Sequence, residues 1–177
     1  MSTSSDLRQI QANMDKLKLA VAKAGSKQVN KMATKVMRKA TATVAKDVGV
    51  PAKTIRGRFK QTARANAAKP IAKVRVNRMN MPAIRLFENR SNKMWIGRGG
   101  IVVGKYAIKR GFRQTLANGR THLMQRRGKA RYAIDVVKIP LSANLTNAVQ
   151  AEVERARTEM QTELKQELAK EFGRILR

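Results

Sequence analysis

The sequence predicts an α+β protein in which helices at both ends of the chain flank a region of antiparallel strands. Three observations support this fold class. Apolar residues recur every three or four positions between Leu7 and Val44, and they do so again after Pro140. Between these stretches, residues 111–139 are rich in strand and turn signals, including the dipeptide Asn118-Gly119. We therefore expect an N-terminal helical hairpin, a twisted, mostly antiparallel β-sheet and a long C-terminal helix.

The chain of 177 residues is long enough for one domain with a substantial core, and we expect a single domain over residues 1–177. Its expected parts are a helical N-terminal part at 1–57, a basic β-sheet part at 58–140 with a loop at 88–104, and a C-terminal helix at 141–177. The sequence contains neither an apolar signal-peptide core nor a run long enough to cross a bilayer. We expect a soluble, intracellular protein that does not enter a membrane.

The first predicted helix extends to about Ala24 and carries one apolar seam. The seam residues are Leu7, Ile10, Met14, Leu17 and Val21. Gly25 is expected to end this helix, and Ser26 to begin a second helix that extends to about Lys46, so that the two form a hairpin. The lysine-rich face of the second helix suits packing within an assembly or adsorption to anionic lipid. The small Ala and Thr residues in its apolar stripe favour packing.

Strands are predicted after a short helix that begins at Pro51 and ends near Gly57. Apolar and polar residues alternate at 59–65, 72–76 and 84–86, which predicts half-buried strands with one basic face. The glycine-rich residues 88–104 are expected to form a mobile loop. Three roles are open for Trp95 in this loop: stacking on a base, insertion into a neighbouring subunit, and packing beneath the loop itself.

Residues 111–139 predict a three-stranded antiparallel meander. Its first two strands, 112–117 and 121–127, are separated by Asn118-Gly119, and the third, 132–139, follows a turn at 127–129. Pro140 is expected to end the third strand because it lacks a backbone N–H. Asp135, the only acidic residue of the meander, is expected to form an ion pair with Arg126, Arg127 or Arg131.

The C-terminal helix is predicted to begin at Ser142 and to continue to about Ile175. Its glutamate, lysine and arginine residues are interleaved, as on an exposed face. A single apolar stripe of this length is expected to contact the N-terminal helices or a partner subunit, which predicts homo-oligomerisation. The interface candidates are Leu145, Val149, Val153, Met160, Leu164, Leu168 and Phe172.

The net charge of +28 predicts a polyanionic partner. Residues 152–177 contain six acidic and six basic residues, so the whole excess lies in residues 1–151. Nucleic acid is the default partner of such a chain, because Lys and Arg that contact phosphates release condensed counterions. The candidate phosphate-binding residues are Lys60, Arg64, Lys73, Arg75, Arg85, Arg90, Lys93 and Arg98.

The composition argues against an enzyme. The chain has no cysteine and one histidine, His122, so the usual zinc sites and cysteine nucleophiles are excluded, and no nucleophile is placed to complete a Ser–His pair. We interpret His122 as a cross-strand packing or hydrogen-bonding residue. No cofactor, metal site or catalytic residue is expected.

A family resemblance is carried by residues 72–86 and 111–140. The second segment contains the pattern NGRxHxMQR, from Asn118 to Arg126, and ends in RYxIDVVKIP, from Arg131 to Pro140. It resembles the minor tail protein Z family of long-tailed bacteriophages, also called tail completion proteins. The order of elements agrees as well. The sequence departs from the family pattern at Thr121, where the family has an aromatic residue, and at Ala133, where it has a proline.

The resemblance implies a virion structural protein that completes the head-proximal end of the tail and supports head–tail joining. It implies assembly in the host cytoplasm and a final location in the virion tail. The implied partners are the tail terminator, the tail tube and the neck or connector proteins. A homo-oligomeric ring around the tail axis is expected to direct the basic residues towards double-stranded DNA at the genome end, which they contact without sequence preference.

Two other classes of function stay open at this point. One is a free, sequence-independent RNA- or DNA-binding protein, although the chain has few aromatic residues for stacking. The other is a scaffold whose charge only docks it onto acidic neighbouring subunits. Affinity for purified DNA separates the scaffold from the two DNA-binding classes, and co-purification with phage particles separates a virion protein from a free nucleic-acid-binding protein.

Overall fold

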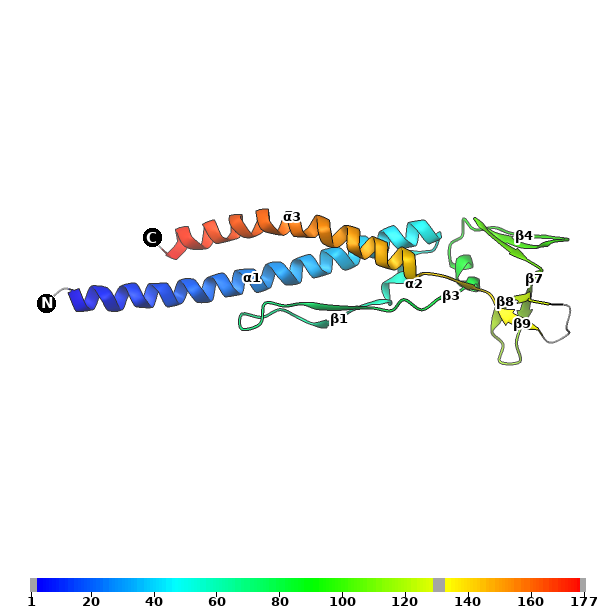
Figure 1. Ribbon diagram of the computed structural model, residues 1–177, viewed down its shortest axis with the longest axis horizontal. Coiled ribbons are helices and arrows are strands. Elements are labelled where there is room, and N and C mark those ends of the chain that lie inside the picture. The colour runs from blue at the N-terminus through cyan, green and yellow to red at the C-terminus, as the bar shows by residue number, and fades with distance from the viewer. Residues whose placement is uncertain (1–2, 129–132, 176–177) are drawn as a thin grey trace. The chain divides into compact units, whose positions relative to one another are not determined.

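The computed structural model describes residues 3–128 and 133–175 and confirms the α+β fold class (Figure 1). Its helices are α1 (Thr3–Val48), α2 (Ala52–Arg56), the 3-10 helix η1 (Ala83–Glu88) and α3 (Ser142–Ile175). Its strands are β1 (Phe59–Ala63), β2 (Lys73–Val76), β3 (Met81–Pro82), β4 (Met94–Gly97), β5 (Gly100–Val103), β6 (Tyr106–Lys109), β7 (Gly111–Thr115), β8 (Thr121–Arg126), β9 (Ile134–Val136) and β10 (Lys138–Ile139).

The chain divides into two compact units, which we call the helical unit and the sheet unit. The helical unit contains residues 1–39, 60–75 and 149–177, and the sheet unit contains residues 40–59 and 76–148. Both α1 and α3 contribute one end to each unit.

The predicted helical hairpin at the N-terminus is wrong, because α1 is one continuous helix through Gly25 and Ser26. Gly25 does not adopt the positive φ of a helix C-cap, and the Ser26 hydroxyl donates a hydrogen bond to the Lys23 carbonyl, 2.9 Å away, within the helix. One interior glycine costs a helix about 1 kcal/mol. The burial of the apolar residues Ala24 and Met32 on either side favours continuation of the helix.

The helix α1 ends at Val48, close to the predicted end at about Lys46. Gly49 has a φ of 78°, and the amide of Val50 donates to the carbonyl of Ala45 at 3.0 Å, so the last turn is closed as in a glycine C-cap. Pro51 then precedes α2, which ends at Arg56 with Gly57 as its C-cap.

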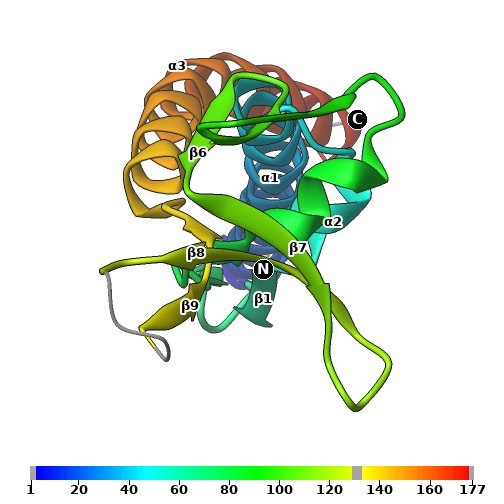
Figure 2. The same ribbon diagram turned by 90° about the vertical axis from the view of Figure 1, so that its right-hand side faces the viewer.

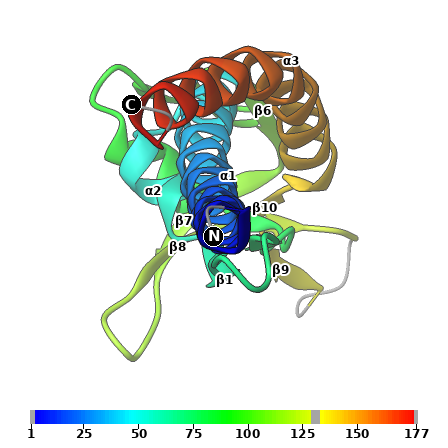
Figure 3. The ribbon, with the colours of Figure 1, turned by 90° about the vertical axis from the view of Figure 1, so that its left-hand side faces the viewer.

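The helical unit consists of the N-terminal part of α1, the C-terminal part of α3 and the hairpin of β1 and β2. The two helices are antiparallel, and α3 lies alongside α1 (Figures 1 and 3). Asn30 of α1 anchors the chain just after β1: its amide nitrogen donates to the Ala65 carbonyl at 2.8 Å, and its amide oxygen accepts from the Ala65 N–H at 2.9 Å. The predicted alternation therefore holds in β1, where the side chains that alternate with Lys60 are half-buried.

The sheet unit contains the largest buried side chains of the described residues. Its strands do not form the single sheet that the sequence predicts; β3 pairs with β10, β4–β6 form a second sheet, and β7–β9 form a third (Figure 2). Arg110, between β6 and β7, has a φ of 54°, and this turn of the backbone separates the last two sheets. The core residues are Ala40, Val44, Val48, Ile55, Met81, Leu86, Ile101, Val103, Leu123, Leu141 and Leu145.

Two predictions for residues 84–104 are wrong. The predicted strand at 84–86 is part of η1, in which Ala83 and Leu86 are buried at a spacing of three residues. Alternation over three residues does not distinguish a strand from such a turn. The predicted mobile loop at 88–104 contains β4 and β5, which pair as a hairpin. Gly97 and Gly100 pair next to its turn, and Gly100 leaves space for the close approach of the Ile108 carbonyl.

The predicted meander is confirmed for β7, β8 and β9, although its strands are shorter than expected. Of the turn residues, Gly119 alone has positive φ, at 73°, and its amide donates to the Leu116 carbonyl at 2.9 Å. The connection is therefore a longer loop with one left-handed glycine rather than a two-residue turn. The last residue of the turn predicted at 127–129 and the first residue of the strand predicted at 132–139 fall in the segment 129–132, which lies outside the described residues. Asp135 forms the predicted ion pair with Arg127.

The long C-terminal helix is confirmed, since α3 begins at Ser142 and ends at Ile175. Leu145 is fully buried in the sheet unit, as is Leu141 just before the helix. None of the described helices combines the length and apolar character that crossing a membrane requires.

Candidate nucleic-acid interface

Four of the predicted phosphate-binding residues lie on the hairpin of β1 and β2. Lys60, Arg64, Lys73 and Arg75 all have exposed side chains. We call these four residues the hairpin cations. In the described part of the chain, no acidic side chain lies within ion-pairing distance of any of them. Their charges are therefore available to an external anion.

The hairpin is more open than the sequence predicts. In β2, Val74 is exposed together with Lys73 and Arg75, so this strand does not have one buried face. Only β1 is half-buried along alternate residues, because Asn30 and Gln61 connect it to α1 through a 3.3 Å hydrogen bond from the Gln61 amide.

The other four predicted residues lie in the sheet unit and do not form one cluster with the hairpin cations. Arg85 is on η1, Arg90 and Lys93 lie between η1 and β4, and Arg98 lies in the turn between β4 and β5. All four are exposed. Arg85 forms an ion pair with Glu88, so part of its charge is neutralised within the chain.

A row of lysines on α1 is neutralised by α3, which the sequence analysis did not foresee. We call the pairs Lys27–Glu167, Lys31–Glu163 and Lys35–Glu159 the ion-pair ladder. The first two distances are 3.1 and 2.7 Å. Lys39 extends the ladder towards Glu159, at 3.6 Å, and the buried Glu152, at 4.0 Å.

The spacing of the ladder residues is the sequence signal that was missed. The lysines and the glutamates both recur every four residues, in opposite chain directions, as two antiparallel helices require. The sequence analysis placed the glutamates on an exposed face, whereas the structure places three of them against lysines of α1. These lysines are therefore poor candidates for phosphate binding.

The ion-pair ladder shifts the pKa values of Lys35, Glu159 and Glu167. The hydrogen bond from Lys35 lowers the pKa of Glu159, with a further contribution from the charge of Lys39. The same hydrogen bond raises the pKa of Lys35. The hydrogen bond from Lys27 lowers the pKa of Glu167 in the same way. The Lys35–Glu159 pair thus stabilises the charged forms of both of its partners.

A cavity of about 540 Å³ in the helical unit extends the hairpin cations onto α1. Arg64 lines it together with Lys31, Lys35 and Arg38 of α1. Because Lys31 and Lys35 already belong to the ion-pair ladder, Arg38 and Arg64 supply the unneutralised charge of this cavity. Arg38 was not among the residues predicted to bind phosphate.

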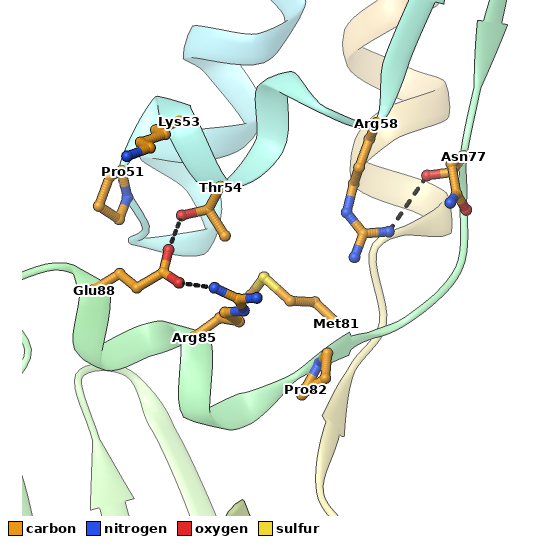
Figure 4. Close-up of a pocket in the computed structure, with 9 residues that line it drawn as sticks. All are labelled: Pro51, Lys53, Thr54, Arg58, Asn77, Met81, Pro82, Arg85 and Glu88. Atoms are coloured by element: carbon orange, nitrogen blue, oxygen red, sulfur yellow. Dashed lines mark hydrogen bonds and ion pairs between the residues drawn. The ribbon is translucent and has the colours of Figure 1, made fainter. Parts of the chain in front are cut away.

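A second cavity, of about 870 Å³, lies in the sheet unit between α2 and η1 (Figure 4). Its charged lining residues are Lys53, Arg58, Arg85 and Glu88. Glu88 accepts hydrogen bonds from Thr54 and Arg85. Burial tends to raise the pKa of Glu88, but these two hydrogen bonds and the nearby positive charges lower it overall.

Arg58 has a structural role at the edge of this cavity. Its guanidinium donates to the backbone carbonyl of Asn77 at 3.4 Å and to that of Met79, and burial lowers its pKa. The cavity therefore has an excess of positive charge. Lys53 contributes to this excess, because no acidic side chain of the described residues forms an ion pair with it. Lys53 and Arg58 were not predicted because Lys53 belongs to the expected short helix and Arg58 lies just before the first expected strand.

Possible metal ligands and the single histidine were also located in the structure. In residues 3–128 and 133–175, no three His, Asp or Glu side chains are grouped so that they could hold a metal ion. His122 is half-buried on β8, opposite Gln114 of β7, and its Nδ1 has no hydrogen-bond partner among the described residues. The packing role predicted for His122 agrees with this position.

Comparison with known proteins identifies relatives over almost the whole chain. Residues 6–177 match the family model described as Prophage minor tail protein Z (GPZ). The chain is 39% identical to the tail completion protein of Escherichia phage N15 over 142 residues, which cover 77% of each chain. It is 34% identical to tail completion protein Z of Escherichia phage lambda, over 96% of this chain and 92% of the relative. No solved structure matches the chain.

Proposed function

The chain belongs to the prophage minor tail protein Z family, and from this premise we propose that it completes the head-proximal end of a phage tail. It is a structural protein of the virion tail. We further propose that it supports head–tail joining and contacts double-stranded DNA at the genome end without reading its sequence. This role requires no catalysis and no cofactor.

The observation that carries the proposed DNA contact is the difference between two sets of basic residues. Lysines of the ion-pair ladder are neutralised by glutamates of α3, whereas the hairpin cations have no acidic partner in the described part of the chain. Basic side chains without acidic partners can bind the phosphate groups of DNA. Because every DNA sequence has the same phosphates, such contacts do not depend on sequence. Arg90, Lys93 and Arg98 are proposed as a second set of phosphate contacts, with Arg85 contributing less.

Self-association is proposed through apolar residues that the chain itself leaves exposed. Val153 and Phe172 of α3 are exposed, while Met160, Leu164 and Leu168 are half-buried. On α1, Leu7, Ile10 and Met14 are exposed as well. Leu145 is enclosed in the core of its own chain, so the proposed interface rests on the residues further along α3 and on Val149.

The proposed assembly is a homo-oligomeric ring around the tail axis. Within it, residues 1–177 act as a single tail-completion domain whose neighbours are the tail terminator, the tail tube and the neck or connector proteins. Assembly takes place in the host cytoplasm, without a membrane step. The test is co-purification with intact phage particles, which is expected for this assembly and not for a free nucleic-acid-binding protein.

The DNA contact is tested by the salt dependence of binding. Lys60→Gln, Arg64→Gln and Arg75→Gln are combined in the full-length chain, and duplex DNA binding is measured over a range of salt concentrations. Each lost phosphate contact lowers the slope of log K against log salt by about 0.9, so the triple variant is expected to lose roughly 2–3 units of slope.

The matched control removes three other exposed charges of the helical unit, Arg8→Gln, Lys16→Gln and Lys18→Gln. This control is expected to keep a slope closer to that of the unmodified chain. Equal slopes for the hairpin variant and the unmodified chain contradict the proposed contact. An unmodified chain that fails to bind duplex DNA at physiological salt favours a scaffold docked onto acidic proteins.

A further inference from the structure

The sheet of β4, β5 and β6 has one buried face and one exposed face. On the buried face, Ile101, Val103 and Ile108 belong to the core of the sheet unit. The pairing register places Trp95 opposite Val102 and Val102 opposite Ala107, so these three residues form one row across the other face. All three are exposed.

Trp95 is held flat against its own strand although its side chain is 69% exposed. A Cβ atom added at Gly97, two residues further along the same face, would lie 2.7 Å from Cζ3 and 3.0 Å from Cη2 of the indole. The ring therefore occupies the space that a side chain at position 97 would fill. The indole therefore lies over Gly97, and most of its surface is exposed.

The next row across this face consists of Gly97, Gly100 and Lys109. Gly100 has a φ of 138°, and a Cβ there would lie 2.1 Å from the Ile108 carbonyl oxygen, so only glycine fits. Both glycines line a groove of about 210 Å³, together with Trp95, Arg98 and Lys109. No acidic side chain is found among the described residues that line this groove.

We propose that this groove binds single-stranded nucleic acid, with one unpaired base stacked on Trp95 and the adjoining phosphate next to Arg98 and Lys109. An aromatic side chain on an open sheet surface flanked by flexible cations is the arrangement that recognises bases by stacking without sequence preference. The other side chains of the exposed rows are small or positively charged, which leaves room for a planar base. The positive charge of the groove complements the phosphate.

This inference rests on the proposed function only in naming nucleic acid as a partner. The bases of an intact duplex are stacked on one another and cannot lie on Trp95, so the groove requires an unpaired strand or a frayed end. The hairpin cations need only the outer phosphates of a duplex. The two sites therefore make separate predictions.

Trp95 provides a direct readout because it is the only tryptophan of the chain. The full-length protein is titrated with single-stranded oligothymidylate, with an abasic oligomer of the same length and charge, and with blunt duplex DNA. Oligothymidylate is expected to quench the tryptophan fluorescence, whereas the abasic oligomer binds more weakly and quenches little. Trp95→Ala is expected to weaken oligothymidylate binding about tenfold, and Trp95→Phe by less, since a phenyl ring still stacks.

The matched control is Ile96→Ala, which removes the neighbouring exposed apolar side chain from the opposite face of β4. It is expected to leave oligothymidylate affinity unchanged, and circular dichroism checks that each variant is folded. Equal quenching by oligothymidylate and the abasic oligomer overturns the inference, as does an unchanged affinity of Trp95→Ala. Quenching by a purified tail protein with none by oligothymidylate also overturns it, because the groove is then a protein-docking surface.

The outcomes also separate this inference from the proposed function. If duplex DNA binds through the hairpin cations but oligothymidylate does not quench Trp95, only the single-strand site fails. If oligothymidylate binds and quenches while duplex binding is unaffected by loss of the hairpin cations, only the proposed duplex contact fails. If the chain binds neither form of DNA, both fail.

Discussion

The Nζ atom of Lys31 lies 2.7 Å from Oε2 of Glu163, although the two residues are 132 positions apart in the sequence. This contact joins α1 to α3 and belongs to a ladder in which both helices contribute a residue at every fourth position. It sets the register of the two helices and removes lysines of α1 from the charge available to nucleic acid.

Reversing one charge of this contact is expected to destabilise the chain, and reversing both is expected to restore it. Lys31→Glu and Glu163→Lys each place like charges opposite each other, and the double variant re-forms the pair with its sign exchanged. Because both side chains are partly exposed, we expect a coupling energy of about 0.5 kcal/mol, measured by chemical unfolding of the two single variants and the double variant. If the effects of the two single variants simply add in the double variant, the pair does not set the register.

The ladder also predicts how stability depends on pH. The folded chain lowers the pKa of Glu159 and Glu167 below the ordinary 4.5, so their contribution to stability is complete above that pH and is lost as the pH falls further. Lys35, with a raised pKa, contributes fully below 10.5 and loses its contribution as the pH rises beyond it. Unfolding measured between pH 7 and pH 3 is expected to show declining stability below about 4.5.

The control for this pH dependence is the double variant Glu159→Gln, Glu167→Gln. It is expected to be less stable at pH 7 and to lose less stability on acidification, because glutamine does not titrate. If the double variant loses as much stability below pH 4.5 as the unmodified chain does, other carboxylates cause that loss.

Two glycines, one inside α1 and one directly after it, are expected to respond in opposite ways to alanine. Gly25 lies inside the helix, and an added Cβ meets no other atom within 4 Å, so Gly25→Ala is expected to stabilise the chain by about 0.5–1 kcal/mol. Gly49 has a φ of 78°, and Gly49→Ala is expected to cost about 1–2 kcal/mol through backbone strain, since its nearest neighbours, at 3.9 Å, leave room for the methyl group. Thermal unfolding measures both changes. A loss of stability in Gly25→Ala contradicts a continuous α1.

Asn30 is expected to hold the β1–β2 hairpin to α1. Asn30→Ala leaves the N–H and the carbonyl of Ala65 without their partner in a residue that is 7% exposed, which is expected to cost about 1–3 kcal/mol. Hydrogen exchange at the Ala65 amide measures the loss directly. Asn30→Asp is the control, because its carboxylate still accepts from the Ala65 N–H while the donor to the carbonyl is gone. Full protection of Ala65 in Asn30→Ala indicates that other contacts hold the hairpin.

Several elements were predictable because their signals are local. The end of α1 at Gly49, the beginning of α3 after Pro140, and the β7–β8 hairpin around Gly119 each follow from residues within a few positions of one another. The exposure of Lys60, Arg64, Lys73 and Arg75 was also predictable from alternation. The prediction failed at Gly25 because a glycine inside a helix costs only about 1 kcal/mol, and the tertiary packing of α1 stabilises the helix by more than that.

The amino-acid sequence was sufficient to predict the fold class, the excess of positive charge in residues 1–151 and the family to which the chain belongs. Tertiary structure decided which cations keep their charge, because Lys31 is neutralised only when Glu163 is brought against it by the antiparallel packing of α1 and α3. It also decided the exposure of Trp95, which depends on the pairing of β4 with β5 and on the space left by Gly97. The physical reason is that local patterns fix backbone conformation, whereas charge balance and exposure depend on residues that folding brings from far along the chain.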